Sequence, residues 1–98
     1  MKTGKIWDVR FTPRGKRDFD SAPREIRTGF LEWVYEVRAL GPFLKGGYRT
    51  ESLRGRLAGF YSARIGRKWR IVFRVFDGRI VLVGFISPHE YCKIGKAR

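Results

Sequence analysis

Arginine residues recur at regular spacing in the second half of the chain, and this spacing predicts a surface that binds phosphate. Arg70 and Arg74 lie in the run from Trp69 to Phe76, where arginines alternate with apolar residues. Because side chains on a strand point alternately to opposite faces, both guanidinium groups would project from one face of a sheet. Arg64 lies in the preceding run, and a register that placed it beside Arg70 would oppose like charges unless an anion lay between them. We therefore expect this face to bind phosphate groups.

Three more side chains with useful chemistry follow the last apolar run. His89, Glu90 and Tyr91 come directly after Pro88, which ends the run IVLVGFIS. Imidazole, carboxylate and phenol groups can exchange protons or hydrogen bonds with a substrate. They would lie at the rim of the sheet that carries the arginines, although a histidine after a strand is commonly an ordinary surface residue.

The composition favours a polyanionic partner. The 98 residues include 22 lysines and arginines against 9 aspartates and glutamates, which gives a net charge of +13. Such a charge promotes salt-sensitive association with nucleic acid or with an acidic protein, but it does not specify a fold. With 43% apolar residues and no low-complexity run, residues 1–98 are expected to form a single domain.

Other classes of protein are disfavoured. A single cysteine, Cys92, and a single histidine provide neither an internal disulfide nor a zinc site, so no metal or cofactor is expected. The first residues lack the apolar run of a signal peptide, and no run approaches the roughly 18 apolar residues of a membrane span. The expected location is the cytoplasm, without a membrane partner.

Three apolar runs, separated by turn residues, predict an antiparallel meander. The runs cover residues 60–65, 69–76 and 79–87, and they are joined by Gly66-Arg67-Lys68 and by Asp77-Gly78. An Asp-Gly pair in this position is typical of a type I′ hairpin turn, in which both central residues have positive φ. The last run is apolar on both faces, so it should lie in the middle of the sheet.

A strand and two helices are expected before the meander. Residues 6–11 alternate like a strand, and Thr12-Pro13 is typical of a helix start, with an end near Asp20. A second helix should begin with Ser21 as its N-cap and stop at Gly41-Pro42. Its apolar stripe should cover the sheet and comprises Ile26, Phe30, Trp33, Val34, Val37 and Leu40. The predicted class is α+β: an N-terminal strand and two helices packed on a curved antiparallel sheet of about four strands.

The ordered motifs between Glu51 and Tyr91 resemble the toxins of the RelE/ParE superfamily. The motifs are Leu-Arg-Gly, Gly-Phe-Tyr-Ser-x-Arg-Ile, Trp-Arg-Ile-Val-Phe-Arg-Val followed by Asp-Gly, and a final Ile-Ser-x-His-x-Tyr. The similarity is strongest to the ribosome-dependent mRNA endonucleases of type II toxin–antitoxin modules, in particular the YoeB-like branch. The resemblance implies a RelE-like fold, metal-independent cleavage of mRNA in the ribosomal A site, and an acidic antitoxin as partner.

The same resemblance implies roles for individual residues. A ribose 2′-hydroxyl would attack the adjacent phosphate, which requires a base, a cation at the phosphate and an acid for the leaving 5′-oxygen. By their positions in the motifs, Glu51 corresponds to the base, Arg70 to the cation and His89 to the acid. Further contacts to RNA are expected from Arg54, Arg56, Arg64, Arg74 and Tyr91.

Two features of the C-terminal residues depart from the YoeB-like pattern. Glu90 separates His89 from Tyr91, and seven residues follow Tyr91 where that branch ends. Because adjacent residues of an extended chain point in opposite directions, this insertion changes which side chain faces the RNA.

Two other functions are compatible with the sequence. A ParE-like inhibitor of DNA gyrase would share the architecture without needing an acid and a base. A noncatalytic basic RNA-binding domain would account for the charge alone.

Overall fold

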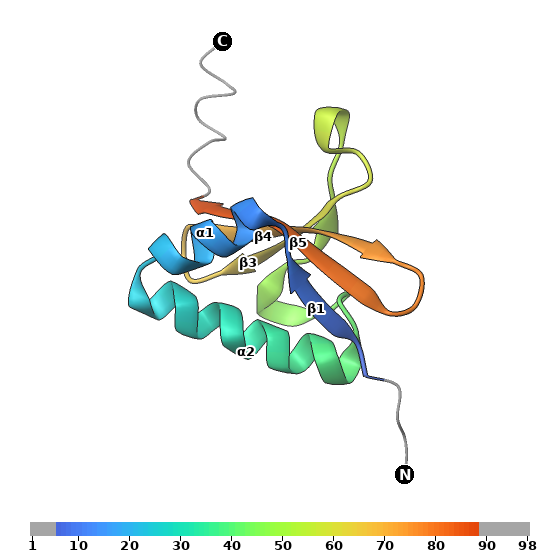
Figure 1. The fold of residues 1–98 in the computed structure, drawn as a ribbon, viewed down its shortest axis with the longest axis horizontal. Helices are drawn as coiled ribbons and strands as arrows, with labels where there is room; N and C mark the ends of the chain where they lie inside the picture. Colours follow the sequence, from blue (N-terminus) through green and yellow to red (C-terminus); the bar gives the residue numbers. More distant parts are fainter. Residues whose placement is uncertain (1–5, 89–98) are drawn as a thin grey trace.

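A computed structural model describes residues 6–88, which form a five-stranded sheet with two helices packed against it (Figure 1). The strands are β1 (Asp8–Phe11), β2 (Glu51–Ser52), β3 (Tyr61–Ile65), β4 (Trp69–Phe76) and β5 (Ile80–Pro88). The helices are α1 (Pro13–Ser21) and α2 (Arg24–Leu40), and two short 3₁₀ turns, η1 (Gly46–Tyr48) and η2 (Gly55–Leu57), lie between α2 and β3. The predicted α+β class is confirmed.

The strand order is β1-β5-β4-β3-β2, and the meander β3-β4-β5 is antiparallel as predicted. β5 lies between β1 and β4, which confirms its predicted central position. The sheet is mostly antiparallel, as predicted, and has one strand more than the expected number of about four, because the short β2 adds a strand at one edge. At the other edge β1 pairs with β5 in parallel. Alternation along residues 6–11 shows which residues share a face, but it carries no information about the direction of the neighbouring strand.

The turn between β4 and β5 also differs from the prediction. Phe76 pairs with Ile80, so three residues form the loop rather than two. Positive φ occurs at Gly78 and Arg79, at 84° and 62°, and not at Asp77. The hairpin is therefore confirmed but the type I′ turn is wrong, because the strand register leaves a third residue in the loop and moves the left-handed pair one position along.

Helix α1 begins where Thr12-Pro13 predicted it. Thr12 Oγ1 accepts a hydrogen bond from the Gly15 N–H at 3.0 Å and donates to the Gly84 carbonyl at 2.9 Å, which anchors the helix start to β5. Asp18 accepts a hydrogen bond from the Ile86 N–H at 3.0 Å, so the helix satisfies a backbone donor of β5 beyond the end of β1. Gly15 lies at this contact, where an added Cβ would be 2.5 Å from the Val83 carbonyl oxygen.

Helix α2 begins later than predicted and ends where predicted. Pro23 occupies the N-cap position without a side-chain hydrogen bond. Ser21 is instead the last residue of α1, where its hydroxyl donates to the Arg17 carbonyl at 2.9 Å, so its predicted N-cap role is wrong. Gly41 ends the helix with a φ of 93°, a conformation that suits glycine.

The hydrophobic core lies between α2 and one face of the sheet. Most of the predicted stripe is buried, namely Ile26, Phe30, Trp33 and Val37, with Val34 half-buried. Trp33 packs on Phe73 of β4 with ring centroids 5.3 Å apart. Leu40 is 73% exposed, contrary to the prediction, because the buried stripe stops at Val37 and the chain turns away at Gly41. Within residues 6–88, neither helix is both long and apolar enough to span a membrane.

A hydrogen bond joins η1 to the outer part of α2. Tyr48 Oη donates to Glu36 Oε2 at 3.0 Å. Desolvation of the phenol raises the pKa of Tyr48 from 10.0 to about 12, assisted by the hydrogen bond to Glu36 and by the negative charges of Glu36 and Glu32. The folded protein therefore holds this proton more tightly than the unfolded chain. The resulting stabilisation is complete below pH 10.0 and is lost as the pH rises towards about 12.

Replacing Gly15 with alanine should destabilise the protein. The added methyl group would meet a backbone carbonyl that can move only with β5. We expect a loss of about 1–3 kcal/mol in the free energy of unfolding, measured by urea denaturation, despite the better helix propensity of alanine. Gly47→Ala is the matched control, since nothing lies within 4 Å of its added Cβ. Equal unfolding midpoints for the two variants would show that α1 does not pack closely against β5 at Gly15.

Replacing Tyr48 with phenylalanine should remove an alkaline transition. Spectrophotometric titration of the folded wild-type protein should show one phenol ionising near pH 12 that is missing from Tyr48→Phe. The difference in stability between the two proteins should also shrink as the pH passes from 10.0 to about 12. A Tyr48→Phe curve that loses a phenol ionising near pH 10.0 instead would contradict the contact with Glu36.

Candidate nucleic-acid interface

The sheet face opposite α2 carries the arginines, and we call it the arginine face. Its side chains alternate with the core residues and come from the three central strands: Ser62, Arg64, Arg70, Val72, Arg74, Leu82, Phe85 and Ser87. Arg64 pairs directly with Arg70 across β3 and β4, as the sequence predicts. Side chains in such positions start about 5 Å apart, so two guanidinium groups extend from adjacent points of one surface.

Arg70 is held more rigidly than an ordinary surface arginine. Only 8% of the residue is exposed, and its neighbours on the same face include Ser62 at 3% and Val72 at 0%. Ser87 pairs with Arg70 on the β5 side, and its buried hydroxyl has no hydrogen-bond partner among residues 6–88. Because burial limits the rotamers of a long side chain, the Arg70 guanidinium presents a preorganised charge.

Two aromatic rings contact the guanidinium group of Arg74, which lies further along β4. The Arg74 guanidinium carbon lies 5.2 Å from the ring centroids of both Phe60 and Phe76. Phe60 packs over Gly84, where an added Cβ would lie 3.6 Å from Phe60 Cε2. Gly84 is the extra residue of a β-bulge, since Val72 pairs with Phe85 while Phe73 pairs with Val83. The bulge therefore makes room for an aromatic ring on the arginine face.

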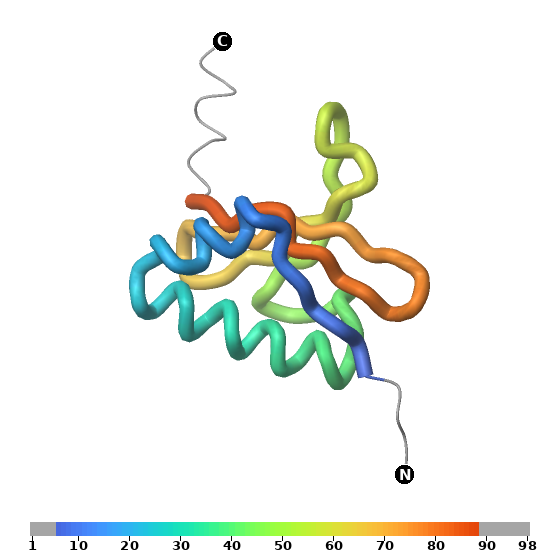
Figure 2. The backbone as a smooth tube through the Cα atoms, in the orientation of Figure 1, coloured from blue at the N-terminus to red at the C-terminus, as the bar shows by residue number. Residues whose placement is uncertain are grey.

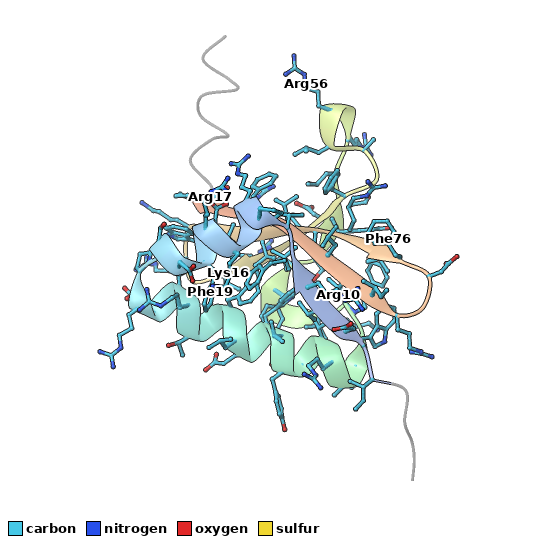
Figure 3. All side chains as sticks on the ribbon, in the orientation of Figure 1. Arg10, Lys16, Arg17, Phe19, Arg56 and Phe76 are labelled. Atoms are coloured by element: carbon cyan, nitrogen blue, oxygen red, sulfur yellow. The ribbon has the colours of Figure 1, made fainter. Side chains whose placement is uncertain are left out.

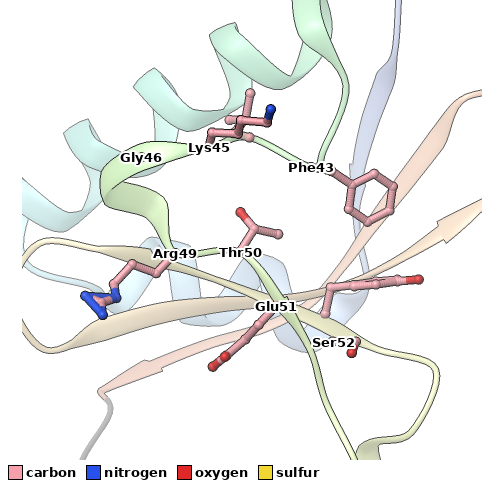
Figure 4. A pocket seen from close by; sticks show the side chains of 9 residues that line it. Phe43, Lys45, Gly46, Arg49, Thr50, Glu51 and Ser52 are labelled. Atoms are coloured by element: carbon pink, nitrogen blue, oxygen red, sulfur yellow. The ribbon is translucent and has the colours of Figure 1, made fainter.

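Glu51 projects from the same face as the arginines. It pairs with Ser62, and directly paired residues of antiparallel strands point to the same side of the sheet. In Figure 4 its carboxylate points away from Phe43 and Lys45, which lie on the helix side of β2. The structure thus places Glu51 at one edge of the arginine face, on the strand next to Arg64.

Arg54 and Arg56 lie on a projecting loop. The loop between β2 and β3 rises from the sheet on the side opposite α2, and its base is closed by a hydrogen bond from the Leu53 N–H to the Phe60 carbonyl at 2.9 Å (Figure 2). Arg56 lies at the tip (Figure 3), and both arginines are exposed. The loop places two more cations beside the arginine face.

Two predicted site residues, His89 and Tyr91, lie outside the described residues. The described chain ends at Pro88, which pairs with Trp69, the residue before Arg70. The last position of β5 is therefore at the end of the sheet that carries the Arg64–Arg70 pair. No group of three metal-ligating side chains occurs in the described part of the chain.

Some features of the surface were not predicted from the sequence. Arg14 of α1 lies over the Phe85 ring at 4.6 Å, which adds a cation to the arginine face from a helix. A cavity of about 520 Å³ lies beside Glu51, between β2 and the Gly-rich loop that follows α2 (Figure 4). Neither has a sequence signal, because both depend on residues that are distant along the chain.

Comparison with known proteins places the fold among bacterial toxins. No family model matches the chain. Toxin HigB-1 of Vibrio cholerae is 38% identical over 45 residues, which is 46% of this chain and 46% of that protein. The match thus spans about half the length of that curated relative.

Solved structures agree along almost the whole domain. The RelBE2 toxin–antitoxin complex of Mycobacterium tuberculosis contains a chain with 26% identity and a TM-score of 0.68, with 86% of this chain and 99% of that chain covered. YafQ from Escherichia coli has 11% identity and a TM-score of 0.74, with coverage of 88% and 97%. The YoeB/ParE toxin of Agrobacterium tumefaciens has 23% identity and a TM-score of 0.70, with coverage of 84% and 98%. The chain therefore has the fold of the RelE/ParE-like toxin superfamily, to which these relatives belong, as its motifs predict.

Proposed function

We propose that this protein is the toxin of a type II toxin–antitoxin module and cleaves mRNA by attack of a ribose 2′-hydroxyl on the adjacent phosphate. The observation that carries the proposal is the pairing of Arg64 with Arg70 on the sheet face that also bears Glu51. Two guanidinium groups that extend from adjacent positions of one sheet face can both contact the same anion. A phosphodiester is an anion that the guanidinium groups of Arg64 and Arg70 can bind at the same time.

The reaction needs few groups. Glu51 takes the proton of the 2′-hydroxyl, the bond between the 2′-oxygen and phosphorus forms, and the bond to the 5′-oxygen breaks. The products are a 2′,3′-cyclic phosphate and a free 5′-hydroxyl, whose proton comes from the acid, His89. Arg70 and Arg64 neutralise the charge that develops on the phosphoryl oxygens, and burial restricts the rotamers of Arg70 before the substrate binds.

The spacing of the strands suits this assignment. β2 and β4 are separated by β3, so their axes lie about 10 Å apart. Glutamate and arginine side chains that extend from one face across that distance can both reach a single nucleotide. Pro88 lies at the Arg70 end of β4, so the chain leads from there to His89. The proposed base and acid would then approach the phosphate from its two sides.

The remaining cations would bind the RNA backbone. Arg74 lies on the arginine face, and Arg54 and Arg56 lie on the loop beside it. Contacts to phosphate release counterions and give salt-sensitive affinity without sequence specificity. The ribosomal A site would supply the orientation of the 2′-hydroxyl, because positioning contributes much of such a rate enhancement. Tyr91 would pack on a base of the substrate.

An acidic antitoxin is the proposed protein partner. The net charge of +13 favours an acidic chain that neutralises it. Structural relatives of this chain include toxins determined in complex with antitoxins, RelBE2 from Mycobacterium tuberculosis and YoeB-YefM from Staphylococcus aureus. We expect the antitoxin to cover the arginine face and to be encoded beside this gene, and we expect both proteins to act in the cytoplasm.

Substitution of the base or of the cation should strongly slow cleavage of mRNA on ribosomes. We expect Glu51→Gln to slow cleavage by about 10²–10⁴-fold and Arg70→Ala by about 10²–10³-fold. Arg70→Lys should recover only part of the loss, because lysine keeps the charge but not the planar fork. His89→Gln should resemble Glu51→Gln. The assay is primer extension on a message translated in the presence of each purified variant.

Arg24→Gln is the matched control, since it removes one positive charge from the exposed start of α2. It should cleave like the wild-type protein, and circular dichroism should show that all variants fold. Full activity of both Glu51→Gln and Arg70→Ala would rule out the proposed site. Inhibition of DNA gyrase supercoiling without cleavage of RNA would favour a ParE-like function instead.

A further inference from the structure

The cavity beside Glu51 has the lining of a nucleotide site. It has a volume of about 520 Å³ and lies at the edge of the sheet, between β2 and the loop that carries η1 (Figure 4). Its walls combine two aromatic rings, Phe43 and Tyr61, with two cations, Lys45 and Arg49. Sites of this size suit small organic ligands. A planar, anionic ligand would match both kinds of wall.

The aromatic wall is fixed and accessible. Tyr61 stacks on the buried Phe73 with ring centroids 5.8 Å apart, so its ring is anchored in the core. Phe43 meets Tyr61 edge-on at 5.0 Å, with an angle of 74° between the rings. Phe43 is nevertheless 55% exposed, which leaves much of its surface uncovered. An exposed ring that is braced by a second ring is a platform on which a base can stack.

The cationic wall is available for an anion. Lys45 and Arg49 are both exposed, and within residues 6–88 neither forms an ion pair. Arg49 has a φ of 48°, a left-handed conformation that is uncommon for a residue other than glycine. This conformation ends η1 and directs the chain into β2 beside the cavity.

A single short strand separates the cavity from the proposed phosphate site. β2 is the edge strand of the sheet and has only two residues. Glu51 lines the cavity while its carboxylate points away from Phe43, towards the arginine face (Figure 4). A polynucleotide that leaves the arginine face at Glu51 therefore reaches the cavity by crossing this strand alone.

We propose that this cavity binds a flanking nucleotide of a single-stranded RNA, one that lies beyond the two nucleotides joined by the scissile phosphate. The base stacks on Phe43, and the phosphate lies beside Lys45 and Arg49. This inference rests on the proposed function for the position of the scissile phosphate. It assigns to Phe43, Lys45 and Arg49 the binding of a flanking nucleotide rather than a part in the chemical step.

The test uses fluorescently labelled 2′-O-methyl RNA, which lacks the attacking hydroxyl. Binding of a dinucleotide and of longer oligonucleotides, extended at either end, is measured by fluorescence anisotropy. Phe43→Ser should weaken binding of one extended series by about 5- to 100-fold and leave the dinucleotide unchanged. Leu31→Ser is the matched control, since Leu31 is 56% exposed on α2, and it should change neither.

The contribution of Lys45 and Arg49 is tested by the salt dependence of RNA binding. Lys45→Gln and Arg49→Gln should each reduce the slope of log affinity against log salt concentration by about 0.7 for that extended series. Arg24→Gln removes the same charge from α2 and should leave the slope unchanged. Circular dichroism and urea denaturation of each variant will exclude unfolding as the cause.

Two outcomes would overturn the inference. The first is Phe43→Ser binding every oligonucleotide as tightly as the Leu31→Ser control. The second is an unchanged affinity for RNA with a loss of binding to the antitoxin, which would assign the cavity to the protein partner. The nuclease proposal fails separately, if Glu51→Gln and Arg70→Ala cleave normally. A length-dependent loss in Phe43→Ser would even then support an RNA site.

Discussion

The structure depends on a register that places two like charges side by side. Arg64 and Arg70 are directly paired on β3 and β4, so their guanidinium groups extend from adjacent positions of one surface. The opposite face of the same strands holds the pairing in place, because Ala63, Ile65, Ile71 and Phe73 are all buried there. A slip of one residue would move this apolar set into solvent, so the core enforces the juxtaposition of charges.

The rest of the fold brings further groups to that pair. Gly15 lets α1 lie directly against β5, and Arg14 thereby reaches the Phe85 ring on the arginine face. The bulge at Gly84 admits Phe60 to the same face, where it supports Arg74. The short β2 adds Glu51 at the edge. Contacts that stabilise the two layers therefore also build the candidate site.

The arginine face and most of the core could be predicted from the sequence because both follow from strict alternation. Arg64, Arg70 and Arg74 fall on one side wherever β3 and β4 pair in register, and the α2 stripe has the period of a helix. The hairpin itself was also predicted, since Asp77-Gly78 marks a reversal whatever the loop length. The RelE/ParE-like fold followed from the order of motifs.

Two errors concern residues four positions apart, where the sequence is compatible with more than one local structure. Ser21 donates to the Arg17 carbonyl within α1 instead of capping α2, and the pairing of Phe76 with Ile80 leaves Arg79 in the loop. The parallel pairing of β1 depends on the path of the whole chain. The cavity lined by Phe43 and Tyr61 forms only when the loop after α2 folds over the sheet edge. Local sequence patterns carry no information about the direction in which β1 pairs or about the formation of this cavity.

The most direct test of phosphate recognition is to observe the two guanidinium groups themselves. Arginine side-chain N–H resonances can be assigned with Arg64→Lys and Arg70→Lys and followed by NMR during titration with a 2′-O-methyl dinucleotide. Shared binding of one phosphate predicts that the Arg64 and Arg70 resonances shift together with a single dissociation constant. Shifts confined to Arg54 and Arg56, with the paired arginines unchanged at saturation, would contradict it.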